Sequence, residues 1–174
     1  GLIFEKINGY RDGSFFTPGF ITMYMCRETL RRAVLQKFNE RYGWECQNVE
    51  TDLHNDLRLH KIPVDAANTL INSLRICDPA VGSGHFLVSA LNELIAVKSD
   101  LGILCHPDGK LLPLNAVVGN DELILTDPDT DQPIEYRPGV LASQRIQETL
   151  FHEKQTLIEN CLFGVDINPK SVMI

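Results

Sequence analysis

The chain has 174 residues, of which 44% are hydrophobic and 22% are charged, a balance that is typical of folded globular proteins and excludes a disordered or collagen-like chain. Its formal net charge of -7 argues against a chain that clamps nucleic acid by itself, because phosphate contacts depend on clustered Lys and Arg. No apolar run reaches the roughly 20 residues of a membrane span, and the five cysteines are widely spaced without a C-x-x-C pair, so we expect a cytoplasmic chain with reduced thiols, no metal site and no membrane partner.

The first predicted element is a helix that follows residues 13–18, G-S-F-F-T-P. Thr17 can cap the free amides of a first helical turn, and Pro18 suits the first helical position because its φ is already set. Apolar residues recur at near-helical spacing to about residue 37, which predicts an amphipathic helix. Its basic residues are expected to form a solvated face: Arg27, Arg31, Arg32 and Lys37.

A helix, a strand, a glycine-rich loop and a second helix are expected next. Residues 39–62 are polar and lack periodicity, which indicates a loop or short helices, and Pro63 opens the following helix. We predict a buried strand over residues 74–77, which ends abruptly at residues 78–84, D-P-A-V-G-S-G. Apolar residues then return at helical spacing from Phe86 onward.

The remaining sequence predicts an insertion, a helix and a second short strand. Residues 99–140 are rich in turn signals and are interpreted as an insertion, with a hairpin of strands over 122–126 and 133–136. A helical pattern covers residues 142–162, and the apolar run over 162–165 ends at Asp166. Strands that alternate with helices in this way predict an α/β fold.

Two predicted strands end at a carboxylate, Asp78 and Asp166, and ligands of parallel α/β sheets bind beyond the carboxyl ends of the strands. Gly82 and Gly84 let the backbone approach a ligand, and the helix that follows offers unpaired amides. Asp166 is well placed to accept hydrogen bonds from ribose hydroxyls. These features together predict a ligand that contains a nucleoside.

The residues that are missing narrow the choice of ligand. A dinucleotide fingerprint needs a third glycine where Leu87 stands, and a P-loop needs a lysine where His85 stands, so NAD, FAD and ATP are disfavoured. A zwitterionic amino acid fits better, because Asp78 can face its ammonium group while the loop amides face its carboxylate. S-adenosylmethionine contains both that amino acid and a ribose.

The motifs also resemble those of a known family. Residues 78–87, D-P-A-V-G-S-G-H-F-L, resemble the cofactor motif of DNA adenine-N6 methyltransferases, and residues 163–169, F-G-V-D-I-N-P, resemble the next motif of these enzymes. Residues 13–18 are similar to the segment upstream that closes over the cofactor. Their order is that of the gamma-type enzymes, and the long spacer is most similar to type IIG restriction-modification and phage-defence methylases.

The resemblance implies a Rossmann-like class I S-adenosylmethionine-dependent methyltransferase fold, incomplete, with a helical segment over 1–73 and the first part of the methyltransferase domain over 74–174. It implies a restriction-modification or phage-defence enzyme that binds double-stranded DNA through parts outside this chain. The expected cofactor-binding residues are Phe16, Thr17, Pro18, Asp78, Pro79, Ala80, Gly82, Ser83, Gly84, Phe86, Asp166 and Ile167.

No catalytic residue is predicted, because the Asn/Asp-Pro-Pro-Tyr/Phe tetrapeptide of the family does not occur in the sequence; Asn168-Pro169-Lys170 is not that motif. We therefore expect part of a larger enzyme, inactive on its own. Methylation of a protein glutamine or of an RNA base, and a non-catalytic cofactor-binding scaffold, remain as alternatives. His85 is interpreted as a pocket wall or a solvent-facing residue rather than an acid or base.

Overall fold

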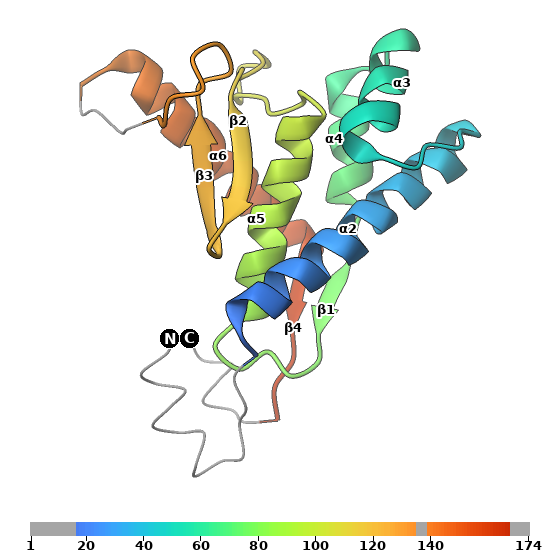
Figure 1. Ribbon diagram of the computed structural model, residues 1–174, viewed down its shortest axis with the longest axis vertical. Helices are drawn as coiled ribbons and strands as arrows, with labels where there is room; N and C mark the ends of the chain where they lie inside the picture. The colour runs from blue at the N-terminus through green and yellow to red at the C-terminus, as the bar shows by residue number, and fades with distance from the viewer. Residues whose placement is uncertain (1–16, 135–138, 168–174) are drawn as a thin grey trace.

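The computed structural model describes residues 17–134 and 139–167, so Phe16 and the rest of residues 13–16 lie outside the described residues. Helix α5 (His85–Asp100) is the central element. Helix α2 (Gly19–Tyr42) crosses one side of α5, a hairpin lies beside it, and helix α6 (Leu141–Cys161) lies behind it (Figure 1). Ten consecutive residues of α5, 89–98, are buried, so this helix forms the middle of the core.

Helix α2 is longer than expected and is capped differently. Its buried residues recur every four positions and form one stripe: Thr22, Cys26, Leu30, Val34 and Phe38. The helix ends at Gly43, whose φ of 71° lies in the left-handed region and whose amide donates to the Asn39 carbonyl. The prediction that Thr17 caps the helix is wrong, because Pro18 occupies the cap position and no side chain caps the first turn.

Two short helical segments follow α2, as the polar stretch predicted. A π-helical turn, η1 (Val49–Leu53), leads directly into α3 (His54–Leu59), and the Asn48 side chain accepts a hydrogen bond from the Thr51 amide at 3.0 Å. Helix α4 (Val64–Asn72) begins after Pro63, which confirms the predicted helix opening. We call α2, η1, α3, α4 and α5 the helical body.

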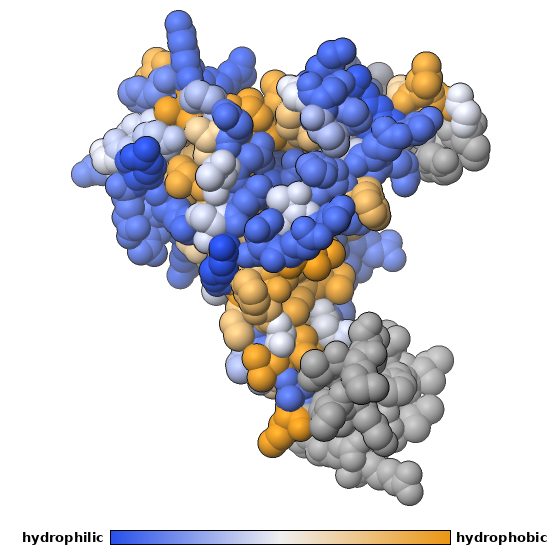
Figure 2. Space-filling model, turned by 180° about the vertical axis from the view of Figure 1, so that it is seen from behind, coloured by the Kyte–Doolittle hydropathy of each residue, from blue (hydrophilic) through white to orange (hydrophobic). Residues whose placement is uncertain are grey.

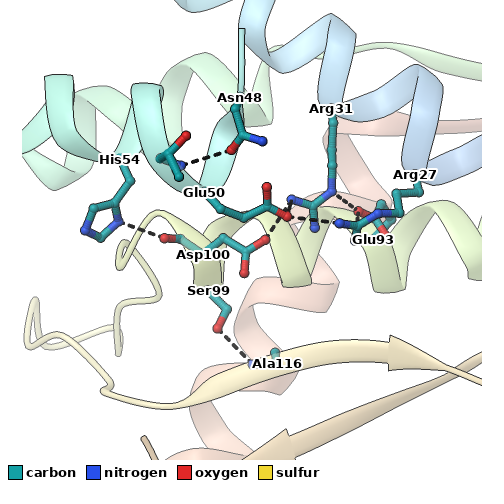
Figure 3. Close-up of polar contacts among 10 residues, drawn as sticks. Arg27, Arg31, Asn48, Glu50, His54, Glu93, Ser99, Asp100 and Ala116 are labelled. Atoms are coloured by element: carbon teal, nitrogen blue, oxygen red, sulfur yellow. Dashed lines mark hydrogen bonds and ion pairs between the residues drawn. The ribbon is translucent and has the colours of Figure 1, made fainter. Parts of the chain in front are cut away.

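The predicted solvated face of α2 is wrong for Arg31, which is only 12% exposed. Arg31 pairs with Glu93 at 2.6 Å and with Asp100 at 2.8 Å, both on α5, and Arg27 pairs with Glu50 of η1 at 3.0 Å (Figure 3). Burial raises the pKa of Glu93 above its ordinary value, and Arg31 opposes that rise. These ion pairs join α2, η1 and α5.

The two strands that were predicted around the ligand site form a parallel pair. Strand β1 (Ile76–Asp78) pairs with β4 (Leu162–Gly164), with Ile76 opposite Leu162 and Asp78 opposite Gly164. The expectation of a buried strand over 74–77 is wrong, because the strand begins two residues later. Cys77 is exposed, since the described sheet has only these two strands and so leaves β1 at an edge. The α/β class is confirmed, and the Rossmann-like arrangement stays a prediction.

The hairpin differs from the predicted one. Strand β3 (Glu122–Thr126) was predicted, but its partner is β2 (Asn115–Gly119), which precedes it in the chain. The turn residues Asn120 and Asp121 have φ of 50° and 68°, the left-handed values that suit a tight two-residue hairpin. Of the other predicted strand, residues 135–136 lie outside the described residues, and Pro133 forms an isolated bridge to Thr126.

The hairpin in the predicted insertion packs closely on the central helix, a contact that the sequence analysis did not predict. Leu114 and Ala116 belong to the core. Ser99 of α5 donates to the Leu114 carbonyl at 2.9 Å. Its hydroxyl also accepts from the Ala116 amide at 2.9 Å (Figure 3). The core cluster takes residues from both sides of residue 73. The division of the chain into two parts at that residue stays a prediction.

Candidate functional site

The site predicted from the sequence lies at one end of the molecule, where β1 and β4 end side by side (Figure 1). The pairing of the two chains continues past the strands: the Val165 amide donates to the Asp78 carbonyl, and the Val81 amide donates to the Val165 carbonyl, each at 2.9 Å. The segments that follow the two strands, 84 residues apart at Gly82 and Asp166, are therefore neighbours. We call residues 78–84 and 164–167 the loop end.

The glycine-rich segment makes a sharp turn into α5. Gly82 has a φ of 51° and Gly84 a φ of 78°, a backbone region that strains residues with a side chain. The Gly84 amide donates to the Val81 carbonyl at 2.7 Å, and α5 begins at the next residue. A Cβ on Gly82 would lie no closer than 3.9 Å to other atoms of the described chain, and one on Gly84 no closer than 4 Å. Both glycines therefore border open space that a ligand can approach.

A third glycine, Gly164, has a role that the sequence analysis missed. A Cβ at this position would lie 2.7 Å from Cγ2 of Val81 and 3.3 Å from Cδ1 of Leu87. Real Cβ atoms do not approach other carbons as closely as 2.7 Å, and 3.3 Å is a tight contact, so glycine lets the end of β4 lie against the loop and the start of α5. In the sequence, the one sign of this role was the glycine within the F-G-V-D pattern of residues 163–166.

Both predicted carboxylates support the loop. Asp166 Oδ2 accepts a hydrogen bond from the Gly82 amide at 2.8 Å, and Asp78 Oδ1 accepts one from the Ala80 amide at 3.0 Å. An ionised carboxylate can accept several hydrogen bonds, so these contacts are compatible with further ones to a ligand. Pro79, Ala80, Ser83 and Ile167 are exposed, and Gly82, Gly84, Asp78 and Asp166 are half-buried.

A cavity of about 230 Å³ lies next to Asp78, between α2, β1 and α5. Its walls are mostly apolar and include Cys26, Phe86 and Leu87, and among the described residues Asp78 is the one charged side chain that lines it. Burial, with a smaller effect of nearby carboxylates, raises the pKa of the Cys26 thiol to about 12, so this cysteine is an uncharged wall rather than a nucleophile. An apolar cavity with one carboxylate suits a ligand with an apolar body and a cationic group.

Thr17 and Pro18, the described part of the upstream segment, directly precede α2, whose start lies close to the start of α5. A Cβ on Gly19 would lie 3.1 Å from Asp121 Oδ2 and 3.6 Å from His85 Nε2. The structure therefore brings the residue after Pro18 near the residue after Gly84.

Sequence reasoning missed Asp121 at the hairpin tip. Its carboxylate accepts from the Ser89 hydroxyl at 2.6 Å and lies 2.7 Å from Nε2 of His85. Only the Asn-Asp pair between two apolar runs marked a turn here, and it carried no indication that the turn reaches α5.

Within residues 17–134 and 139–167, no group of three His, Cys, Asp or Glu side chains is arranged to hold a metal ion. No helix in the same part of the chain has the length and apolar character to cross a membrane. Figure 2 shows apolar surface where the molecule narrows toward its loop end, and Phe163, Val165 and Ile167 are exposed in that region of the chain.

Comparison with known proteins gives two curated relatives. A protein named as a type II restriction enzyme and methyltransferase, from Methanocaldococcus jannaschii, is 35% identical over 123 residues, which is 62% of this chain and 10% of that protein. The adenine-specific methyltransferase BrxX of Escherichia coli is 26% identical over 109 residues, 61% of this chain and 9% of that protein. The chain thus spans about a tenth of the length of these relatives. No protein-family profile and no solved structure matches it, and the two similarities support a DNA methyltransferase family.

Proposed function

We propose that this chain is the S-adenosylmethionine-binding part of a gamma-type DNA adenine-N6 methyltransferase of a restriction-modification or phage-defence system. The observation that carries the proposal is the hydrogen bond from the Gly82 amide to Asp166, which joins the two predicted cofactor motifs at one edge of a parallel strand pair. Both relatives are named as methyltransferases, and one of them is named as adenine-specific.

The residues of the loop end fit the chemical groups of this cofactor. The loop amides and the N-terminus of α5 suit the carboxylate of its amino-acid part, and Asp78 suits the ammonium group. Asp166 suits the ribose hydroxyls. The remaining proposed contacts are the predicted ones, in which the loop backbone and the segment before α2 surround the ligand: Phe16, Thr17, Pro18, Pro79, Ala80, Ser83, Gly84, Phe86 and Ile167.

In the proposed reaction, the cofactor supplies a methyl group on a sulfonium, and this chain binds and orients the donor. The adenine must leave the duplex and be held by a pocket of its own. Because no Asn/Asp-Pro-Pro-aromatic tetrapeptide occurs in the 174 residues, we propose that the adenine pocket and the double-stranded DNA contacts belong to parts of a longer protein. On this proposal the chain alone transfers no methyl group.

Calorimetry with S-adenosylhomocysteine, the demethylated cofactor, tests the proposal. The chain should bind it, and Gly82→Val should weaken binding at least about tenfold, because the new side chain would occupy the open space beside the loop. Gly43→Val is the matched control: Gly43 has a similar φ of 71° and open surroundings, but it lies at the far end of α2.

Gly43→Val should keep the affinity of the unchanged chain. Binding of NAD in place of S-adenosylhomocysteine would show that the ligand is wrong. Equal affinity of Gly82→Val and the unchanged chain would show that the site is wrong.

A further inference from the structure

The tip of the β2–β3 hairpin contacts the first turns of α5. Asp121 Oδ1 accepts from the hydroxyl of Ser89, which is 1% exposed, and Oδ2 lies 2.7 Å from His85 Nε2. The side chains of Asp121 and His85 are 20% and 30% exposed, so the contact between them is partly shielded from water. His85 is the first residue of α5 and directly follows Gly84.

The same tip also contacts the start of α2. The backbone amide of Asp121 lies 2.8 Å from the Met23 sulfur, and the nearest atom to a Cβ on Gly19 would be Asp121 Oδ2 at 3.1 Å. The hydroxyls of Thr22 on α2 and Ser89 on α5 are 3.3 Å apart. One residue thus connects the starts of the two helices that follow the upstream segment and the glycine loop.

We propose that Asp121 is a positioning residue for the cofactor site: the hairpin tip holds His85, and with it the N-terminal turn of α5, against the start of α2. The inference rests on the proposed function. Asp121 does not touch the cofactor. It acts through His85 and Ser89, because a displaced first turn would move the amides that face the amino-acid part of the ligand.

Because of this arrangement, removing Asp121 should affect the binding of only one half of the ligand. On the proposed function, the amides of the α5 N-terminus face the amino-acid part. Asp166 faces the ribose, and it is held by the Gly82 amide rather than by Asp121. Loss of Asp121 should therefore weaken contacts to the amino acid and leave those to the nucleoside.

The test compares two ligands by calorimetry, S-adenosylhomocysteine and 5′-methylthioadenosine, which lacks the amino-acid part. Measurements are made at a temperature where circular dichroism shows every variant folded. Asp121→Asn should weaken binding of S-adenosylhomocysteine by roughly three- to tenfold and change binding of 5′-methylthioadenosine by less than about twofold. Glu122→Gln is the matched control, because this neighbouring carboxylate is exposed, and it should change neither affinity.

A double-mutant cycle gives a second measurement. If Asp121 acts through His85, the double variant His85→Ala, Asp121→Asn should lose no more affinity for S-adenosylhomocysteine than the stronger of the two single variants. Additive losses would overturn the inference, as would equal losses for both ligands, which indicate a merely structural role, or an unchanged affinity in Asp121→Asn. If the unchanged chain binds neither ligand, the proposed function fails and the inference fails with it.

Discussion

In the helical body, buried side chains hold α2 against α5, whereas at the loop end the chain is held mainly through backbone groups. Arg31, Glu93 and the stripe on α2 are buried or nearly so, but no residue of 78–84 or 164–167 is buried. The loop end instead relies on amide hydrogen bonds, such as Gly82 to Asp166, and on a close approach at Gly164. A ligand site needs exposed groups. Here the helical body buries the side chains that stabilise the fold, and the loop end keeps its groups exposed.

Among substitutions that test this comparison, Arg31→Ala in the helical body should lower the free energy of unfolding the most. The substitution leaves the carboxylate of Asp100 without the Arg31 cation and leaves the buried carboxylate of Glu93 with only the more distant Arg27, at 4.0 Å. It should lower the free energy of unfolding by about 3 kcal/mol. Urea denaturation followed by circular dichroism measures the loss.

Arg32→Ala is the matched control, because Arg32 is 79% exposed and, within residues 17–134 and 139–167, forms an ion pair only with Glu28. Its effect should be about 0.5 kcal/mol or less. Similar losses for the two variants would mean that the body does not depend on its buried ion pairs.

At the loop end, Gly164→Ala should have the next largest effect. The added Cβ would press on Val81, and overpacking of this kind costs about 1–3 kcal/mol. The free energy of unfolding is measured by urea denaturation, together with the affinity for S-adenosylhomocysteine.

The double variant Gly164→Ala, Val81→Ala should recover part of both losses, because the shorter side chain makes room for the Cβ. A double variant that is worse than Gly164→Ala alone would contradict the steric explanation. It would indicate that the loop end needs the Val81 side chain for a reason other than its contact with residue 164.

The smallest effect is expected from Asp127→Asn in the exposed turn after β3. A hydrogen bond from the Thr130 amide, helped by the Thr130 hydroxyl, lowers the pKa of Asp127 below its ordinary value of 3.8. A carboxyl with a depressed pKa in the folded state contributes stability above that ordinary value and loses it as the pH falls through the folded-state pKa.

The difference in stability between Asp127→Asn and the unchanged chain should therefore be present at pH 7 and vanish at acid pH. Urea denaturation at several pH values measures it. The pH dependence of stability has the opposite sign for Glu93, because burial raises the pKa of this carboxyl. The contribution of Glu93 to stability is fully present below the ordinary pKa of 4.5 and is lost as the pH rises through the folded-state pKa. The difference in stability between Glu93→Gln and the unchanged chain should therefore depend on pH in the opposite direction to that of Asp127→Asn.

Local signals in the sequence predicted most elements of the molecule. The apolar spacing after Gly84 predicted α5, Pro63 predicted the start of α4, and the apolar run before Asp166 predicted β4. The glycine loop was recognisable because its residue types are needed by its own backbone, as the φ values of Gly82 and Gly84 show.

Two of the errors concern partners that lie far apart in the chain. Arg31 was placed on a solvated face because its partner Glu93 is 62 residues away. Ser89 and Asp121 are 32 residues apart, so neither indicated the other. The strand before the Asn120–Asp121 turn was missed because the later proline-rich turn gave the stronger local signal. Local propensity indicates elements, and only packing decides which of them meet.

The cavity beside Asp78 also has a consequence for labelling chemistry. Its two cysteines differ: Cys26 is buried and holds its proton, whereas Cys77 is exposed on β1. Maleimides react with thiolates that solvent can reach, so Cys77 should be modified ahead of the buried Cys26, Cys46 and Cys161. A fluorophore attached there would sit beside Asp78, and its emission could follow occupancy of the cavity without any engineered cysteine.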